Sequence, residues 1–182
     1  MRIIGGKYKH KRFDVPTTFK ARPTTDFAKE SLFNILLHND YIDFDDAPRA
    51  LDLFAGTGSI SIELLSRGCS CVVSIEKDFR HWQFLQRICR ELGDTAWHPL
   101  HADVFKYVTR TRARGNLFHI IFADPPYALD NLRSLPDLVF GNELLAEGGV
   151  FILEHGKTDD FSTHPHFVDH RTYGSVNFTF FQ

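Results

Sequence analysis

The chain has 182 residues, of which 43% are hydrophobic and 24% are charged. This composition excludes a disordered protein, and we expect residues 1–182 to form a single domain with a sizeable core. No apolar run approaches the roughly 20 residues that span a bilayer, and the basic residues 1–11 lack the apolar stretch of a signal peptide. We therefore expect a soluble, cytoplasmic protein that does not bind membranes.

Cysteine and charge patterns narrow the class further. Cys69, Cys71 and Cys89 are an odd number without a Cys-x-x-Cys pair, so we predict core cysteines, no disulfide and no metal site. The net charge is −2, yet residues 1–30 carry a net +5 and the remainder −7. A basic arm over residues 1–22 can contact phosphates, but lysines also protect sheet edges. Charge alone leaves both interpretations open.

The first elements in chain order are a small appendage and a helix. Residues 2–20 alternate loosely and contain Gly5-Gly6 and Pro16, which predicts a small N-terminal β-hairpin or loop ahead of a core over residues 23–182. A helix should begin near Thr24, Thr25 and Asp26, because Thr and Asp are natural N-caps. Its buried face is predicted to contain Phe27, Leu32, Phe33, Leu36 and Leu37.

From Arg49 onward, short apolar runs alternate with amphipathic stretches. The predicted strands are Ala50–Phe54, Cys71–Ile75, Leu100–Ala102, Leu117–Ala123 and Val150–Glu154. The predicted helices are Ser59–Arg67, Phe79–Leu92, Val104–Arg112 and Leu129–Val139. This alternation indicates an α/β fold, with a mostly parallel sheet covered by helices on both faces.

The pattern changes near the C-terminus. Phe167–Tyr173 and Ser175–Phe181 read as two strands separated only by Gly174, which predicts an antiparallel hairpin. A parallel sheet that ends in an antiparallel hairpin is the arrangement of Rossmann-like class I methyltransferases, whereas the dehydrogenase sheet is parallel throughout. The sequence therefore favours the methyltransferase version of the fold.

A glycine loop follows the first core strand. In the segment from Asp52 to Gly58, Gly56 and Gly58 let the backbone turn sharply and approach a ligand at the start of a helix. A dinucleotide fingerprint requires a third glycine, but Ser61 stands there, which argues against a nicotinamide oxidoreductase.

Acidic residues end three successive strands: Asp52, Glu76 and Asp103. Ligands of open α/β sheets bind at these strand ends, where Glu76 can accept ribose hydroxyls and Asp103 can hold an adenine amino group. Each acid alone could equally be a helix N-cap. Together they favour a cationic sulfonium ligand over a pyrophosphate. The predicted cofactor site comprises Asp52, Phe54, Gly56, Gly58, Glu76, Lys77, Asp103 and Val104.

A rigid tetrapeptide, Asp124-Pro125-Pro126-Tyr127, follows the fourth strand. Two prolines fix the backbone and remove two N–H donors, so the loop presents carbonyl oxygens and one carboxylate. Such acceptors can hold the N–H groups of an exocyclic amine out of the base plane and free the nitrogen lone pair for methylation. Tyr127 would stack on the base, a contact worth about 1–3 kcal/mol. The alternative is a stiff turn without catalytic function.

Several motifs resemble those of one family. They are Arg2–Lys7, Arg22-Pro-Thr-Thr-Asp26, Lys29–Leu36, Asp52–Gly58 with Glu63 and Ser66–Gly68, Asp124–Tyr127, and Tyr173-Gly174. Over essentially the whole chain the sequence resembles the bacterial 16S ribosomal RNA guanine-N2 methyltransferases. It departs from them at Phe27, where the family usually has a basic residue, and at residues 87–90, which lack the usual asparagine.

The resemblance implies a seven-stranded sheet and S-adenosylmethionine as cofactor, with S-adenosylhomocysteine as product and no metal. It implies that a monomer methylates N2 of one guanine of 16S rRNA in the small ribosomal subunit. Asp124 and Tyr127 would engage the guanine. The predicted RNA-binding residues are Lys7, Lys9, Lys11, Arg12, Arg22, Thr24 and Thr25.

Other functions share parts of this pattern. A DNA adenine-N6 methyltransferase uses the same acceptor geometry, but those enzymes usually carry an added domain that reads a duplex. Enzymes that methylate glutamine in a release factor usually have Asn in place of the Asp at position 124. A non-catalytic RNA-binding scaffold with the same fold is a further alternative, and the intact Asp124 and glycine loop argue against it.

Overall fold

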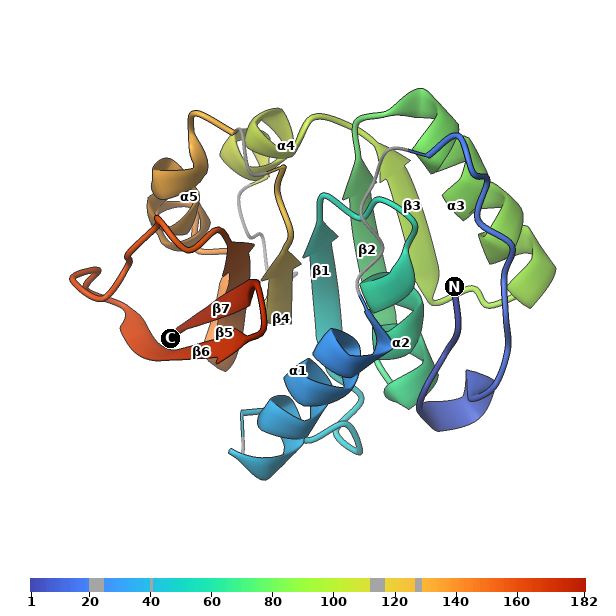
Figure 1. The fold of residues 1–182 in the computed structure, drawn as a ribbon, viewed down its shortest axis with the longest axis horizontal. Helices are drawn as coiled ribbons and strands as arrows, with labels where there is room; N and C mark the ends of the chain where they lie inside the picture. Colours follow the sequence, from blue (N-terminus) through green and yellow to red (C-terminus); the bar gives the residue numbers. More distant parts are fainter. Residues whose placement is uncertain (20–24, 40, 112–116, 127–128) are drawn as a thin grey trace.

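The computed structural model describes residues 1–19, 25–39, 41–111, 117–126 and 129–182 (Figure 1). Within them, one seven-stranded sheet has the order β3-β2-β1-β4-β5-β7-β6. The strands are β1 (Arg49–Leu53), β2 (Cys71–Glu76), β3 (Trp97–His101), β4 (Phe118–Ala123), β5 (Leu145–His155), β6 (Phe167–Tyr173) and β7 (Val176–Phe181). Strands β1 to β5 are parallel and β7 is antiparallel to both neighbours, which confirms the predicted fold class.

Helices cover both faces of the sheet. They are α1 (Asp26–His38), α2 (Ser59–Arg67), α3 (Phe79–Leu92), α4 (Val104–Arg110) and α5 (Leu135–Gly141), with 3₁₀ turns η1 (Gly6–Tyr8) and η2 (Leu132–Ser134). One core cluster lies beneath α1, α2 and α3, and a second lies beneath α4 and α5. None of the helices in the described ranges has both the length and the apolar character needed to cross a membrane.

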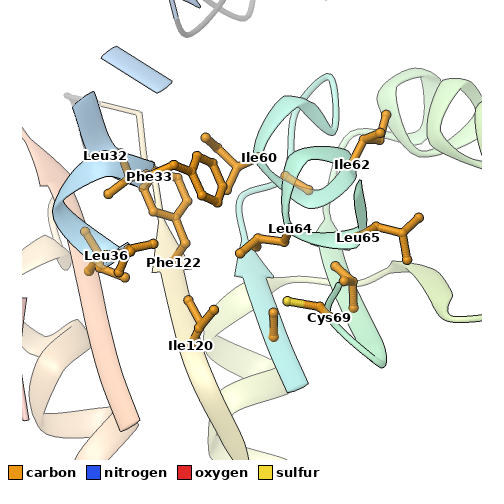
Figure 2. Packing of buried hydrophobic residues seen from close by; sticks show 14 of the residues in the cluster. Leu32, Phe33, Leu36, Ile60, Ile62, Leu64, Leu65, Cys69, Ile120 and Phe122 are labelled. Carbon is orange, nitrogen blue, oxygen red and sulfur yellow. The ribbon is translucent and has the colours of Figure 1, made fainter. Parts of the chain in front are cut away.

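The core that supports the site lies where α1 and α2 meet over the middle of the sheet. Leu36 of α1 and Ile60 of α2 pack with Phe122 of β4, and all three are at most 4% exposed (Figure 2). Burial of a side chain of this size contributes about 1.5–3 kcal/mol, so this cluster fixes both helices to the strands beneath them.

Two predictions about the buried face of α1 are wrong. Phe27 is 67% exposed and Leu37 is 42% exposed, whereas Ile35 and Lys29, outside the predicted face, are buried. Leu37 follows the buried stripe by one position and turns outward. Phe27 stands in the first turn of the helix, beyond the part that packs on the sheet.

Several element boundaries also differ from the prediction, and β5 begins at Leu145 rather than Val150. Strand β3 begins at Trp97, which is 2% exposed, rather than at Leu100, which is 41% exposed. Pro99 obscures this strand in the sequence, but proline is tolerated on the edge strand that β3 forms. Helix α5 begins at Leu135 rather than Leu129, and Pro136 lies in its first turn, where proline is favoured.

The predicted N-terminal hairpin is short. Its antiparallel pairing is a single bridge between Arg2 and Arg12, closed by η1. The Ile3 N–H donates to the Lys11 carbonyl oxygen on one side of the bridge, and the Phe13 N–H donates to the Met1 carbonyl oxygen on the other. The Gly5-Gly6 pair allows this turn to lie against the end of α2. Gly6 has φ +69°, and a Cβ there would lie 1.8 Å from the Ser66 carbonyl oxygen. Only glycine fits this approach.

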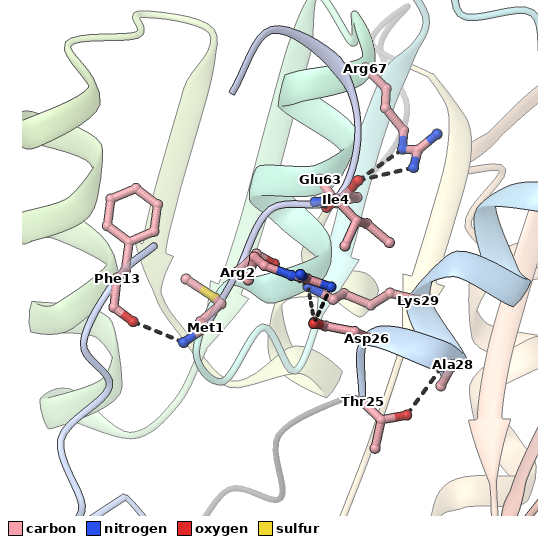
Figure 3. A network of polar contacts seen from close by, with 10 residues as sticks. All are labelled: Met1, Arg2, Ile4, Phe13, Thr25, Asp26, Ala28, Lys29, Glu63 and Arg67. Atoms are coloured by element: carbon pink, nitrogen blue, oxygen red, sulfur yellow. Dashed lines mark hydrogen bonds and ion pairs between the residues drawn. The ribbon is translucent and has the colours of Figure 1, made fainter. Parts of the chain in front are cut away.

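A buried lysine joins the N-terminal segment to α1 (Figure 3). Lys29 is 1% exposed, donates to the Arg2 carbonyl oxygen at 2.5 Å and lies 3.5 Å from the Asp26 carboxylate. Burial lowers the pKa of Lys29, an effect that the charges of Glu63 and Asp26 oppose. A charged group is retained in this core only because its partners compensate for lost hydration.

Glu63 of α2 completes this network from the other side. Its carboxylate is fully buried, accepts from the Ile4 N–H at 3.0 Å and pairs with Arg67 at 3.0 Å (Figure 3). The Ser66 hydroxyl, one turn later, accepts from the Tyr8 N–H at 2.8 Å. Helix α2 therefore fixes the N-terminal segment at several points.

We expect Lys29→Met to lower the free energy of unfolding by about 1–3 kcal/mol, because it removes a charged donor and leaves the Arg2 carbonyl oxygen without that partner. Urea unfolding of wild type and variant measures the difference. The matched control is Glu30→Gln, since Glu30 is exposed on the same helix. Equal stability of the two variants would show that the Lys29 network does not hold the N-terminal segment.

Candidate functional site

The glycine loop between β1 and α2 has an unusual backbone. Phe54, Gly56 and Gly58 all have positive φ, of +64°, +54° and +74°. A positive φ in a bulky residue such as Phe54 is strained, and such strain concentrates at functional sites. At Gly58, the N-cap of α2, a Cβ would lie 2.6 Å from Cδ2 of Leu85. The two predicted glycines are therefore required by the loop itself.

Glu76, at the end of β2, holds this loop. One carboxylate oxygen accepts from the Gly56 N–H and the other from the Asp78 N–H, both at 2.7 Å. The side chain is 8% exposed. Glu76 thus joins the loop after β1 to the turn after β2, and lies at the cavity wall where the sequence predicts a cofactor contact.

Asp52 lies in β1 beneath the loop and is 2% exposed. Its carboxylate accepts from the Ser61 hydroxyl, which also shares a hydrogen bond of 2.6 Å with Ser74. Burial is the main cause that raises the pKa of Asp52 to about 7; the charges of Asp124 and Glu76 act in the same direction, and the Ser61 hydrogen bond opposes them. The site is therefore poised to gain a negative charge when a cation binds beside it.

Asp103 and Lys77 form an ion pair of 2.9 Å at the ends of β3 and β2. The hydrogen bond from Lys77 lowers the pKa of Asp103, and the Lys106 N–H adds to this effect. Asp103 is also the N-cap of α4, which is the structural role that the sequence analysis gave as the alternative for each of these acids. It lines the cavity together with Val104, the first residue of that helix.

The predicted catalytic loop follows β4 directly. The Asp124 N–H donates to the Leu53 carbonyl oxygen at 3.4 Å, which places Asp124 beside the end of β1. Pro125 is buried and Pro126 is exposed. Tyr127 lies outside the described residues.

One cavity of about 1100 Å³ connects these groups. Its wall contains residues 54–57 of the glycine loop but not Gly58, together with the acids Asp52, Glu76, Asp103 and Asp124 and both prolines of the catalytic loop. All lie at the carboxyl ends of the parallel strands, where open α/β sheets bind ligands. Within the part of the chain that the structure describes, no cluster of His, Cys, Asp and Glu side chains could hold a metal ion.

The residues predicted to bind RNA are more scattered. Thr25 caps α1 by accepting from the Ala28 N–H and also lines the cavity. Lys7 pairs with Asp94 at 2.6 Å, so its charge is locally compensated. Lys9, Lys11 and Arg12 are exposed, whereas Arg22 and Thr24 lie outside the described residues.

The cavity wall also contains residues that the sequence did not identify as part of a site, among them Glu154, Tyr173 and Phe27. Phe27 and Tyr173 meet edge to face, with ring centroids 6.2 Å apart. Glu154 near the end of β5 is 6% exposed. The rule that selected the other acids, a carboxylate at the end of a strand, would have found Glu154 as well.

The strand order, the antiparallel β7 and the acid-lined glycine loop define a Rossmann-like methyltransferase fold. The chain belongs to the family described as Conserved hypothetical protein 95, whose model matches residues 1–182. The resemblance noted from the motifs is thereby confirmed at the level of the family.

Individual relatives agree with this assignment. The chain is 30% identical over 165 residues to ribosomal RNA small subunit methyltransferase D of Escherichia coli K12, covering 91% of this chain and 79% of the relative. It is 30% identical over 158 residues to the protein of the same name from Buchnera aphidicola, covering 87% and 77%. The structure of a hypothetical protein from Thermus thermophilus superposes with a TM-score of 0.85 at 29% identity, covering 100% and 99%.

The raised pKa of Asp52 predicts how stability varies with pH. Its contribution to folding is complete below the ordinary value of 3.8 and is lost as pH rises through about 7. Wild type should therefore lose about 2–3 kcal/mol relative to Asp52→Asn between pH 5 and pH 8. Denaturant unfolding at both pH values measures the change. A pH-independent difference would mean that Asp52 is ionised throughout.

Proposed function

We propose that this protein is an S-adenosylmethionine-dependent methyltransferase that methylates the exocyclic N2 of a guanine in the 16S rRNA of the small ribosomal subunit. The observation that carries the proposal is a shared cavity. The acid-lined glycine loop and the Asp124-Pro125-Pro126 segment face the same space, at the ends of neighbouring strands. A methyl donor and an amine acceptor can therefore lie side by side.

The half of the cavity beside the glycine loop, where the methyl donor would bind, suits a cationic nucleoside. Glu76 is fixed by two backbone amides and keeps lone pairs for ribose hydroxyls, and Asp103 with Val104 borders the place for adenine. Asp52 provides a buried carboxylate that a cation would favour in its ionised form. Bound S-adenosylmethionine supplies an electrophilic methyl group, whereas a pyrophosphate would be repelled by these acids.

The other half of the cavity, beside Asp124, would hold the amine that receives the methyl group. The Asp124 carboxylate and the Pro125 carbonyl oxygen accept the two N–H groups of the exocyclic nitrogen, so its lone pair is no longer spread into the ring and points at the methyl group. Alignment of the two reactants can contribute up to roughly 7–11 kcal/mol. The same acceptors stabilise the positive charge that develops on nitrogen, and the Asp124 carboxylate would accept the proton that the methylated nitrogen loses. Tyr127 is proposed to stack on the base.

The RNA assignment rests on the family and on charge. Two relatives are named small-subunit rRNA methyltransferases. Lys9, Lys11 and Arg12 are exposed on the arm over residues 1–22, ahead of the catalytic core over residues 23–182. Exposed cations of this kind bind phosphates in a salt-dependent manner. We propose that the protein acts as a cytoplasmic monomer without a metal, and that the arm contacts rRNA beside the cavity.

Replacing Asp124 tests the chemistry. We expect Asp124→Ala to fold and to bind S-adenosylmethionine, but to lose about 10²–10³ in methyl-transfer rate, as when one preorganised hydrogen-bonding group is removed. The matched control is Asp130→Ala, because Asp130 is exposed just beyond the loop and outside the cavity wall. Full activity of the Asp124 variant would overturn the catalytic assignment.

The substrate is identified in the same assay. Labelled methyl transfer is measured in parallel on small subunits, naked rRNA and DNA, and the modified nucleoside is identified after digestion. The proposed function predicts N2-methylguanosine from small subunits or their rRNA. N6-methyladenosine in DNA would support the DNA methyltransferase alternative, and no transfer to any substrate would favour the non-catalytic scaffold.

A further inference from the structure

Glu154 lies level with the catalytic aspartate on the neighbouring strand. Strands β4 and β5 are parallel, and their register pairs Ala123 with Leu153, so positions 124 and 154 are equivalent in the two strands. Adjacent strands lie about 4.8 Å apart. Both carboxylates line the cavity. The two acids are therefore spaced to contact neighbouring atoms of one planar base.

The pleat of β5 fixes the direction of the Glu154 side chain. Ile152 and Phe178, the β7 partner of Glu154, belong to the cluster beneath α1 and α2, whereas Leu153 belongs to the opposite cluster. Side chains alternate between the faces of a strand, so Glu154 projects on the α1 side. Phe27 of α1 lines the same cavity. Glu154 thus faces the space in which an acceptor base would lie.

Burial of the Glu154 carboxylate favours hydrogen-bond donors as its partners. Glu154 is 6% exposed, and an ionised carboxylate only accepts hydrogen bonds. In a site of low dielectric, such an interaction is strengthened and a mismatched group is costly. In its ionised form, Glu154 therefore favours a substrate that presents an N–H group to it.

We propose that Glu154 reads the N1–H of the target guanine while Asp124 and the Pro125 carbonyl hold its 2-amino group. In guanine, the N1–H donor is adjacent to the exocyclic amine. In adenine, N1 is an acceptor and is adjacent to the 6-amino group, so the same carboxylate would repel it. Glu154 then accounts for the choice of guanine over adenine, which the catalytic tetrapeptide does not determine. This inference rests on the proposed function.

The test compares two bases at the target position. Wild type is first assayed on small subunits, and the methylated nucleotide is mapped. That guanosine is then replaced by 2-aminopurine, which keeps the 2-amino group but has an acceptor at N1. We expect wild type to prefer guanine in kcat/KM by at least about 10 to 10²-fold, the effect of one hydrogen bond to a charged group. Glu154→Gln, whose amide can donate to N1, should reduce this preference about tenfold or more.

The comparison between enzymes isolates the N1 contact, because 2-aminopurine also lacks O6 and that loss affects both enzymes. Glu147→Gln is the matched control, since Glu147 is exposed near the start of the same strand and should keep the wild-type preference. Thermal unfolding and S-adenosylmethionine affinity of Glu154→Gln should match wild type. If that variant does not fold, equal wild-type rates on the two bases would still overturn the inference.

The outcomes separate the two proposals. Failure of wild type to form N2-methylguanosine overturns the proposed function, and the role of Glu154 with it. Methylation of guanine with the same preference in wild type and Glu154→Gln overturns only the role of Glu154. A wild-type preference for 2-aminopurine also overturns that role, because it would mean that Glu154 donates a proton to N1 instead of accepting one.

Discussion

The cavity depends on a chain of buried hydrogen bonds that ends at Asp52. The Trp97 indole N–H of β3 donates to the Ser74 hydroxyl of β2 at 2.7 Å, Ser74 shares a hydrogen bond with Ser61 of α2, and Ser61 donates to Asp52 of β1. Such a network fixes the relative positions of all four elements, provided each member is satisfied. The network holds the Asp52 carboxylate under the glycine loop, although burial there disfavours the ionised form and raises the pKa to about 7. A cation in the cavity would offset that cost.

The side of the cavity where the methyl-accepting base would lie depends on a separate set of contacts. Lys29 and Glu63 join the N-terminal segment to α1 and α2, and Gly6 allows the turn to pack against α2. Through α1, these contacts position Thr25 and Phe27 at the wall of the cavity. The exposed cations of the arm are therefore held on the same body as the proposed catalytic groups, which supports a shared RNA surface.

Local patterns predict most of the fold and part of the candidate site. The strand ends, the glycine loop and the Asp124 segment follow from short-range rules, as does the Thr25 cap. Contacts that depend on distant partners escape such rules: Lys7 meets Asp94 from 87 positions away. Glu154 satisfies the rule for acids at strand ends, but its place beside Asp124 follows only from the register of β4 and β5. In the sequence, Ser61 is notable only because it stands where a dinucleotide-binding motif has a glycine. In the structure, its hydroxyl donates a hydrogen bond to Asp52.

Cofactor binding as a function of pH tests the central claim most directly, namely that the buried Asp52 carboxylate is part of a site for a cationic methyl donor. Calorimetric titration with S-adenosylmethionine is carried out at pH 6 and pH 8 on wild type and Asp52→Asn. With a free-protein pKa of about 7, wild-type affinity should rise about tenfold more than that of the variant over this range, because binding favours the ionised carboxylate. The same pH dependence in both proteins would contradict the account.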